Sequence, residues 1–413
     1  MKFALFVTAA AASVTAIGAG YATPDRLAAP LIPFAIDSVA SPAGPGSAEP
    51  NLTVAPDGRV YMSWLQATDS GGTALRFAVH DGSMWSDART IVQGKDFFVN
   101  WADFPSIEVL GKNRLAAHWL QRNGKTTYAY SVRIAQSNDG GATWSTPLTP
   151  HRDSTESEHG FVAMWHEGTT LGAAWLDGRR FTKGGHDASN QMTLMTTTVS
   201  ANGTRGAEVL LDDRTCDCCQ NAAAVTSAGP IVIYRNRSPE EIRDIYITRR
   251  VAGKWVAGVA VHDDGWKIAA CPVNGPAVAA SGKRVVLAWF TAPNDSGRVN
   301  VAFSDDAGAT FGAPTRIDGG SPAGRVDVAL LADGGALVTW VERTGGDGAA
   351  VRTQRVTRDG KAGTPVTIAA SRAARASGFP KAVVTGANVM FAWTVVGKPS
   401  MVRVARASLG EFR

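Results

Sequence analysis

The sequence predicts an all-β chain made of seven similar sheets, and two features support this. First, 44 glycines and 20 prolines punctuate short runs of Val, Ile, Leu and Ala, which is typical of strands joined by tight turns. Second, a short apolar strand that ends in an aromatic residue recurs every 51–59 residues, at Trp64, Trp119, Trp175, Tyr234, Trp289, Trp340 and Trp393. Four strands per repeat at this period predict a β-propeller of seven four-stranded blades, with six blades as the alternative.

The first repeat illustrates how the strands are assigned within each unit. "PNLTVAPDG" (residues 50–58) is the innermost strand, and "GRVYMSWLQ" (58–66) is the aromatic-marked second strand. "LRFAVHDG" (75–82) and "ARTIVQ" (88–93) follow as the third and fourth strands. The seventh repeat, residues 378–408, supplies only three strands, whereas "IPFAIDSVA" (32–40) has no repeat of its own. We therefore expect residues 32–40 to complete the last blade, the alternative being a free N-terminal tail.

The N-terminus has the features of a secretory signal peptide. Residues 1–22 contain one lysine, an apolar run and the small-x-small pattern of Gly20 to Ala22. No second membrane span is expected, so residues 23–413 should form one exported domain, periplasmic or secreted. The whole chain has 41 basic against 36 acidic residues without a basic run, which argues against nucleic acid as a partner.

Two turns share a more specific pattern, S-x-D-x-G-x-T-aromatic. They read "SNDGGATW" (137–144) and "SDDAGATF" (304–311). The Ser and Asp side chains are expected to bind nearby backbone N–H groups, while the aromatic fills the gap between sheets. With these motifs the chain resembles the sialidase superfamily of β-propellers, whose BNR repeats carry such Asp boxes. The resemblance implies the fold, and it implies that the Asp boxes face away from any ligand.

The opposite face, called the top face below, is where functional residues are expected. It receives the loops that lead into each innermost strand and the loops that follow the repeat aromatic. Hydrogen-bonding residues stand in most of these loops, which predicts a polar, ligand-accessible surface. The alternative is that these residues are polar only because the strand ends meet solvent. The candidate ligand-binding residues are Trp101, Asp103, Gln121, Asp177, Arg179, Arg235, Asn236, Asn274 and Arg325. The dense polar element "YRNRSPEEIRD" (234–244) could orient the neighbouring cysteine loop.

All four cysteines fall on the top face, in two equivalent loops of neighbouring repeats. Cys216, Cys218 and Cys219 precede the fourth repeat, and Cys271 precedes the fifth. One interpretation is disulfide bonding, as expected for an exported chain. The other is a thiolate metal site, for which soft ligands favour Cu(I) and then zinc, with His159 of the preceding repeat as a further ligand. Copper is thus the candidate cofactor, because C-x-C-C differs from the C-x-x-C pairs of structural zinc sites.

An enzymatic role would require the active-site residues of this superfamily. The resemblance implies three arginines that hold a substrate carboxylate, a Tyr/Glu nucleophile pair and an acid/base aspartate. The family's Arg-Ile-Pro motif is absent, since the corresponding region reads "SAEPNLTVAP" (47–56), and only Asp103, Arg325 and Glu342 remain as weak catalytic candidates. The sequence therefore favours an exported binding protein with a cysteine-centred site. An exo-acting glycoside hydrolase or a carbohydrate-binding module of the same superfamily is the alternative, with a sugar as ligand.

Overall fold

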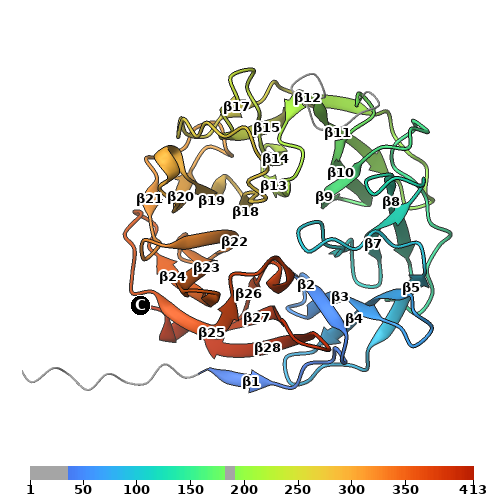
Figure 1. Cartoon of the computed structure of the whole chain (residues 1–413), viewed down its shortest axis with the longest axis horizontal. Coiled ribbons are helices and arrows are strands. Elements are labelled where there is room, and N and C mark those ends of the chain that lie inside the picture. Colours follow the sequence, from blue (N-terminus) through green and yellow to red (C-terminus); the bar gives the residue numbers. More distant parts are fainter. Residues whose placement is uncertain (1–35, 182–190) are drawn as a thin grey trace, which may run out of the picture. The chain divides into compact units, whose positions relative to one another are not determined.

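Seven antiparallel sheets follow one another around a central axis in the computed structural model (Figure 1), which describes residues 36–181 and 191–413. Each sheet begins with its innermost strand and continues outward along the chain. The seven-bladed β-propeller predicted from the aromatic spacing is thereby confirmed, and the six-bladed alternative is wrong. The predicted signal peptide and residues 32–35 of the predicted closing strand lie outside the described residues.

Four sheets have four strands drawn from one continuous stretch of chain. The first consists of β2 (Ser47–Val54), β3 (Val60–Ala67), β4 (Thr73–His80) and β5 (Arg89–Gly94). The third consists of β9 (His159–Glu167), β10 (Thr170–Asp177), β11 (Met192–Val199) and β12 (Val209–Thr215). The fifth consists of β18 (Ala277–Ser281), β19 (Arg284–Thr291), β20 (Arg298–Ser304) and β21 (Thr315–Arg316). The sixth consists of β22 (Pro322–Leu330), β23 (Ala336–Gly345), β24 (Gly348–Val356) and β25 (Val366–Arg372).

Two sheets depart from four regular strands. The second has β6 (Ser106–Val109), β7 (Leu115–Arg122) and β8 (Tyr130–Ser137), and its fourth position is reduced to a bridge between Ile134 and Leu148. The fourth has β13 (Ala222–Thr226), β14 (Gly229–Arg235) and β15 (Ile245–Val251). Two short strands, β16 (Lys254–Trp255) and β17 (Val259–Ala260), both pair with β15. Only short 3₁₀ turns interrupt the strands, and among the described residues no helix is long and apolar enough to cross a membrane.

The seventh sheet joins the two ends of the described chain. It contains β26 (Lys381–Thr385), β27 (Asn388–Val395) and β28 (Met401–Ser408), with β1 (Asp37–Val39) as the outer strand. Asp37 pairs with Arg406 and Val39 with Val404. The backbone N–H of Val402 also donates to the Ser47 hydroxyl at 2.9 Å, which ties the seventh blade to the first. The segment expected to close the ring, residues 32–40, includes β1.

The core lies between neighbouring blades, so both faces of most strands are buried. Each main apolar cluster combines residues of two adjacent sheets, for example the second with the third and the fifth with the sixth. The repeat aromatics Trp64, Trp175, Tyr234, Trp289 and Trp340 are completely enclosed there. The second strands therefore read as continuous apolar runs, because neither face meets water.

The two S-x-D-x-G-x-T turns have the hydrogen bonds that their sequence predicts. The Ser137 hydroxyl donates to Asp139 at 2.8 Å and accepts from the N–H of Gly141 at 2.8 Å, and the N–H of Thr143 donates to Asp139 at 2.9 Å. Residues 304–310 repeat this pattern. A Cβ on Gly141 would lie 2.5 Å from the Phe77 ring of the preceding blade, so the turn packs against its neighbour.

Candidate functional site

The cysteine loop, residues 216–221, connects β12 to β13 on the top face. The N–H of Cys216 donates to the carbonyl of Arg235 at 2.9 Å, which fixes the start of the loop. The Cys216 sulfur lies 3.0 Å from the Cys219 sulfur and 3.7 Å from the Cys218 sulfur. These three sulfur atoms all lie within 4.8 Å of one another. Cys216 and Cys219 are each only 1% exposed.

Cys271 reaches the same place from the loop between β17 and β18. Its thiol faces the Asp217 carboxylate, with 3.6 Å between sulfur and oxygen. It forms a second group with Asp217 and Cys218, whose ligand atoms also lie within 4.8 Å of one another. The four cysteines therefore gather as two overlapping groups that share Cys218, rather than as one four-thiol cluster.

No disulfide joins these cysteines, and all four are free thiols in this structure. The closest sulfur pair, Cys216 and Cys219, is 3.0 Å apart, against about 2.05 Å in a disulfide. The structure therefore corresponds to the reduced site and not to the disulfide alternative.

Arg243 supplies the main positive charge beside the thiols. Its guanidinium donates to the Cys216 sulfur at 3.4 Å and lies 3.6 Å from Asp217. Burial opposes ionisation of Cys216, but hydrogen bonds from Cys218 and Cys219 and the charge of Arg243 outweigh it, so the Cys216 thiol has a pKa well below its usual range. The site thus favours a thiolate at Cys216.

The polar element around residues 234–244 holds this arginine in place. Glu241 accepts from Arg243 at 2.9 Å and from Arg237 at 2.7 Å. The guanidinium of Arg235 is buried and donates to the carbonyls of Asn274, Arg243 and Phe290. Arg235 and Asn274 therefore connect the fourth and fifth blades.

His159 lies in a different group from the cysteines, so its expected place among them is wrong. Its Nε2 is 3.2 Å from both carboxylate oxygens of Asp153, and its Nδ1 faces the carbonyls of Tyr130 and Ser157. The His151 ring stacks on it at 3.9 Å. This histidine pair and Asp153 form a compact polar group that the sequence analysis did not single out, because it depends on how residues 151–158 fold back over β9.

Asp103 belongs to a buried acidic cluster. Its carboxylate accepts from the N–H of Phe161 at 2.8 Å, and the Tyr130 hydroxyl lies 3.0 Å from Glu158 and 3.5 Å from Asp103. Burial raises the pKa of Asp103 to about 8, and the charge of Glu158 adds to this effect. With Asp103 only 3% exposed, the cluster is closed to a large substrate.

Several polar residues that follow the repeat aromatic have an internal partner. The indole N–H of Trp175 donates to Asp177 at 2.8 Å, and that of Trp340 donates to Glu342 at 2.6 Å. Residues two apart in a strand share a face, which explains this pairing. The Asp177 carboxylate also forms an ion pair with the Arg179 guanidinium, with 2.6 Å between oxygen and nitrogen.

The remaining predicted residues are likewise bound within the protein. Gln121 donates to Asp96 at 2.6 Å, and Asn236 donates to Asp212 at 3.0 Å. Arg325 donates to the carbonyls of Ala373 and Ala374, both at 3.0 Å. Its guanidinium lies 4.9 Å from the centre of the Trp101 ring, and burial lowers its pKa to about 10.

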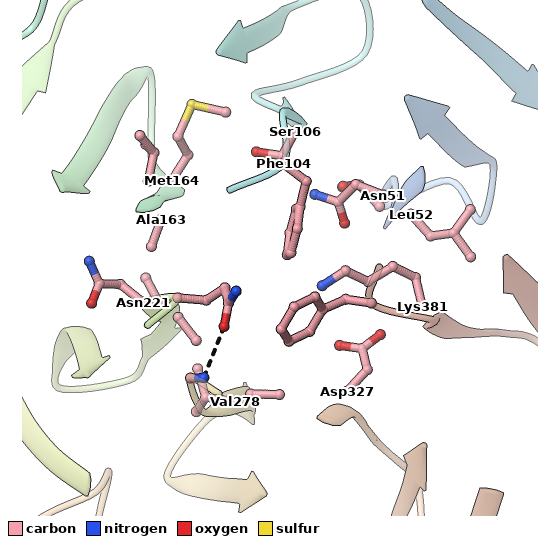
Figure 2. Close-up of a pocket in the computed structure, with 18 of the residues that line it drawn as sticks. Asn51, Leu52, Phe104, Ser106, Ala163, Met164, Asn221, Val278, Asp327 and Lys381 are labelled. Atoms are coloured by element: carbon pink, nitrogen blue, oxygen red, sulfur yellow. Dashed lines mark hydrogen bonds between the residues drawn. The ribbon is translucent and has the colours of Figure 1, made fainter. Parts of the chain in front are cut away.

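An axial cavity of about 240 Å³ lies between the innermost strands and adjoins the cysteine loop. Figure 2 shows Asn51, Phe104, Asn221, Asp327 and Lys381 around it. The Lys381 ammonium lies 4.3 Å from the centre of the Phe104 ring. The side-chain oxygen of Asn221 is buried without a hydrogen-bond partner among the described residues. Asn51, Asp327 and Lys381 stand on innermost strands, so a search of the loop positions alone does not predict this cavity.

Comparison with known proteins gives matches of fold only. No family model and no curated protein matches the chain. The lectin BP39L from Burkholderia pseudomallei is 12% identical and superposes with a TM-score of 0.62, covering 88% of this chain and 97% of that one. A NanB sialidase from Streptococcus pneumoniae is 8% identical, with a TM-score of 0.46 and coverages of 92% and 95%. The endosialidase of phage phi92 is 10% identical, with a TM-score of 0.49 and coverages of 91% and 69%.

These neighbours include both sugar-binding and sugar-cleaving proteins, and at such low identity they carry no assignment of activity. The superposition on the lectin, over 88% of this chain, supports the propeller fold described above. In its fold, the chain is a seven-bladed β-propeller similar to that of the lectin BP39L.

Proposed function

We propose that this protein binds Cu(I) through the thiolates of Cys216, Cys218 and Cys219. The observation that carries the proposal is the convergence of three sulfurs, with separations of 3.0 and 3.7 Å from Cys216. Three sulfurs bound to one ion at about 2.3 Å are themselves about 3.7–4 Å apart. Cys218 already has this separation from Cys216, and Cys219 needs to move outward by less than about 1 Å.

The ligand type favours Cu(I) over zinc. Soft thiolates select Cu(I), and two or three of them suffice for that ion. Structural zinc sites take four ligands in a tetrahedron, whereas the fourth sulfur here, Cys271, belongs to the neighbouring group with Asp217. Three thiolates around Cu(I) carry an excess of two negative charges, and the Arg243 guanidinium, 3.4 Å from Cys216, offsets part of it.

Export belongs to the same proposal. Residues 1–22 have the pattern of a signal peptide, and thiols in an oxidising compartment persist when they are metallated or paired. Metal binding accounts for why three cysteines stand together in a chain that has only four. The proposed protein is thus a periplasmic or secreted copper-binding propeller.

The test is an anaerobic titration of the reduced protein with Cu(I) in competition with a chromophoric Cu(I) chelator. We expect one ion per chain and a loss of affinity of about 100-fold or more in the double variant Cys218→Ser/Cys219→Ser. The unfolding temperature of the metal-free variant should match that of the metal-free wild type. A variant that keeps its copper, or that unfolds far earlier without any change in metal content, would refute the proposal.

A second candidate function, binding of a small carbohydrate, is favoured by one observation in the axial cavity. Asn51, Asp327 and Lys381 surround this space with polar atoms, and the Phe104 ring lies beside them. Sugar hydroxyls could bind to these side chains while the Phe104 ring contacts the apolar side of the sugar. Calorimetric titration with a panel of monosaccharides tests it, and Asn51→Ala should weaken any binding by about 10-fold.

Hydrolysis is not part of either proposal. The three candidate catalytic residues, Asp103, Arg325 and Glu342, are each buried and held by backbone or side-chain partners. An aryl sialoside should therefore remain intact with the purified protein. Release of sialic acid that disappears in an Arg325 variant would contradict binding as the main role.

A further inference from the structure

The two cysteine groups share one residue and differ in their access to solvent. Cys271 is exposed and Cys218 is partly exposed, whereas Cys216 and Cys219 are each 1% exposed. Cys218 has its sulfur within 4.8 Å of ligand atoms in both groups. A path of sulfur atoms therefore leads from the surface to the interior, and Cys218 is the step that both groups have in common.

We propose that Cys271, Cys218 and Asp217 form a capture site for Cu(I), from which the ion passes to the inner thiols by ligand exchange on Cys218. This inference rests on the proposed copper-binding function and adds the route of loading. The partner is a Cu(I) carrier with exchangeable sulfur ligands, because the buried inner sulfurs cannot reach a carrier directly.

The two loops are held together closely enough for this exchange. The side chain of Gln220, directly after Cys219, accepts from the N–H of Gly275 at 2.9 Å, four residues beyond Cys271. A Cβ on Gly275 would lie 2.1 Å from the Gln220 carbonyl, so the backbones of the two blades touch at this point. The positions of both groups are thus fixed relative to each other before any ion arrives.

Asp217 orients the outer thiol. Its Oδ1 lies 3.6 Å from the Cys271 sulfur and 3.6 Å from the Arg243 guanidinium, so one carboxylate links the exposed thiol to the buried cation. The carboxylate can accept the proton that Cys271 loses when it binds the ion. Asp217 is therefore assigned as a positioning residue of the capture site.

The exchange conserves atoms and electrons. Two bonds between Cu(I) and carrier thiolates break as bonds to the Cys271 and Cys218 sulfurs form, and the protons of these two thiols pass to the two departing thiolates, that of Cys271 through Asp217. Bonds to the Cys216 thiolate and to Cys219 then form while the bond to Cys271 breaks and that to Cys218 is kept. The proton released by Cys219 returns to Cys271, and copper stays in the +1 state throughout.

The experiment separates the rate of loading from the strength of binding. Reduced protein is mixed rapidly with the Cu(I) complex of a chromophoric chelator, and the loss of chelator colour is followed. Cys271→Ser should retain an equilibrium affinity within about 10-fold of wild type but load at least about 10-fold more slowly. Cys271→Met, which keeps a soft sulfur, should recover most of the rate, and Ala270→Ser is the matched control with wild-type behaviour.

Three outcomes would overturn the inference, and they can be told apart. Wild-type loading by Cys271→Ser would eliminate the capture site while copper binding stands. A loss of affinity as large as that of Cys218→Ser/Cys219→Ser would make Cys271 a permanent ligand and remove the two-step path. A wild-type protein that binds no Cu(I) would refute the proposed function itself. Equal unfolding temperatures of the metal-free variants show that the fold is intact in each comparison.

Discussion

Replacing Asp103 by Asn should remove a pH dependence from the stability of the protein. The folded state raises the pKa of this carboxyl to about 8 from its usual value of 3.8, mainly through burial. Between these two values the unfolded chain has lost the proton whereas the folded chain still holds it. Wild-type stability should therefore fall as the pH rises through this range, by about 1.4 kcal/mol per pH unit from this group.

The asparagine variant isolates that contribution. Its side-chain oxygen can still accept from the N–H of Phe161, which donates to Asp103 at 2.8 Å in the wild type, and it carries no proton to titrate. The free energy of unfolding of Asp103→Asn minus that of wild type should increase by about 4 kcal/mol from pH 4.5 to pH 7.5. Below pH 3.8, where both states hold the proton, the difference should be constant.

Urea unfolding at half-unit pH intervals measures this difference. Asp139→Asn serves as the control, because hydrogen bonds from Thr143 and Ser137 lower the pKa of Asp139 to about 2. Its difference from wild type should not change between pH 5 and pH 8, since both folded and unfolded states are ionised there. Parallel pH profiles for wild type and Asp103→Asn would show that Asp103 is already ionised in the folded protein, which would refute the reasoning.

Three further substitutions and one control test the packing and the hydrogen bonds of the blades by thermal or urea unfolding. Gly172→Ala should destabilise by about 1–3 kcal/mol, because its Cβ would lie 2.1 Å from the Trp165 ring, while Gly312→Ala, with 3.8 Å to the nearest atom, should be close to neutral. Ser304→Ala should cost about 1–2 kcal/mol through three lost hydrogen bonds in its turn; an unchanged midpoint would contradict this. Glu342→Ala should cost about 2–4 kcal/mol, because an indole and two backbone N–H groups lose their acceptor; no loss of stability would argue against that role.

Most of the fold could be predicted from the sequence because a blade is encoded locally. An aromatic residue stands near the end of each second strand, and this pattern recurs at a nearly constant period, so the number of blades follows from counting. The outer strands were harder to predict. In the second sheet, the fourth strand is reduced to a bridge between Leu148 and Ile134. A strand at the outer edge of a blade has few neighbours that would stabilise a longer pairing.

The gathering of the cysteines could also be predicted, because equivalent loops of adjacent blades must meet near the axis. Their division into two groups could not, since it depends on the backbone path beyond Cys271, where Val273 has a φ of +49°. Similarly, Asp177 and Glu342 looked available to a ligand in the sequence. Their indole partners become apparent only when the two-residue offset along a buried strand is considered.

The pairing of β1 with β28 has a consequence for how the chain folds. Asp37 and Arg406 are separated by almost the whole described chain, so bringing them together carries a loop-closure cost of about 5 kcal/mol before any contact forms. A three-residue strand recovers little of this alone, and packing between the first and seventh blades must accompany it. Ring closure is therefore expected to be the slow, late event of folding. Until β28 has been synthesised, the first six blades keep apolar faces exposed at both open ends, and the chain needs protection from aggregation during that interval.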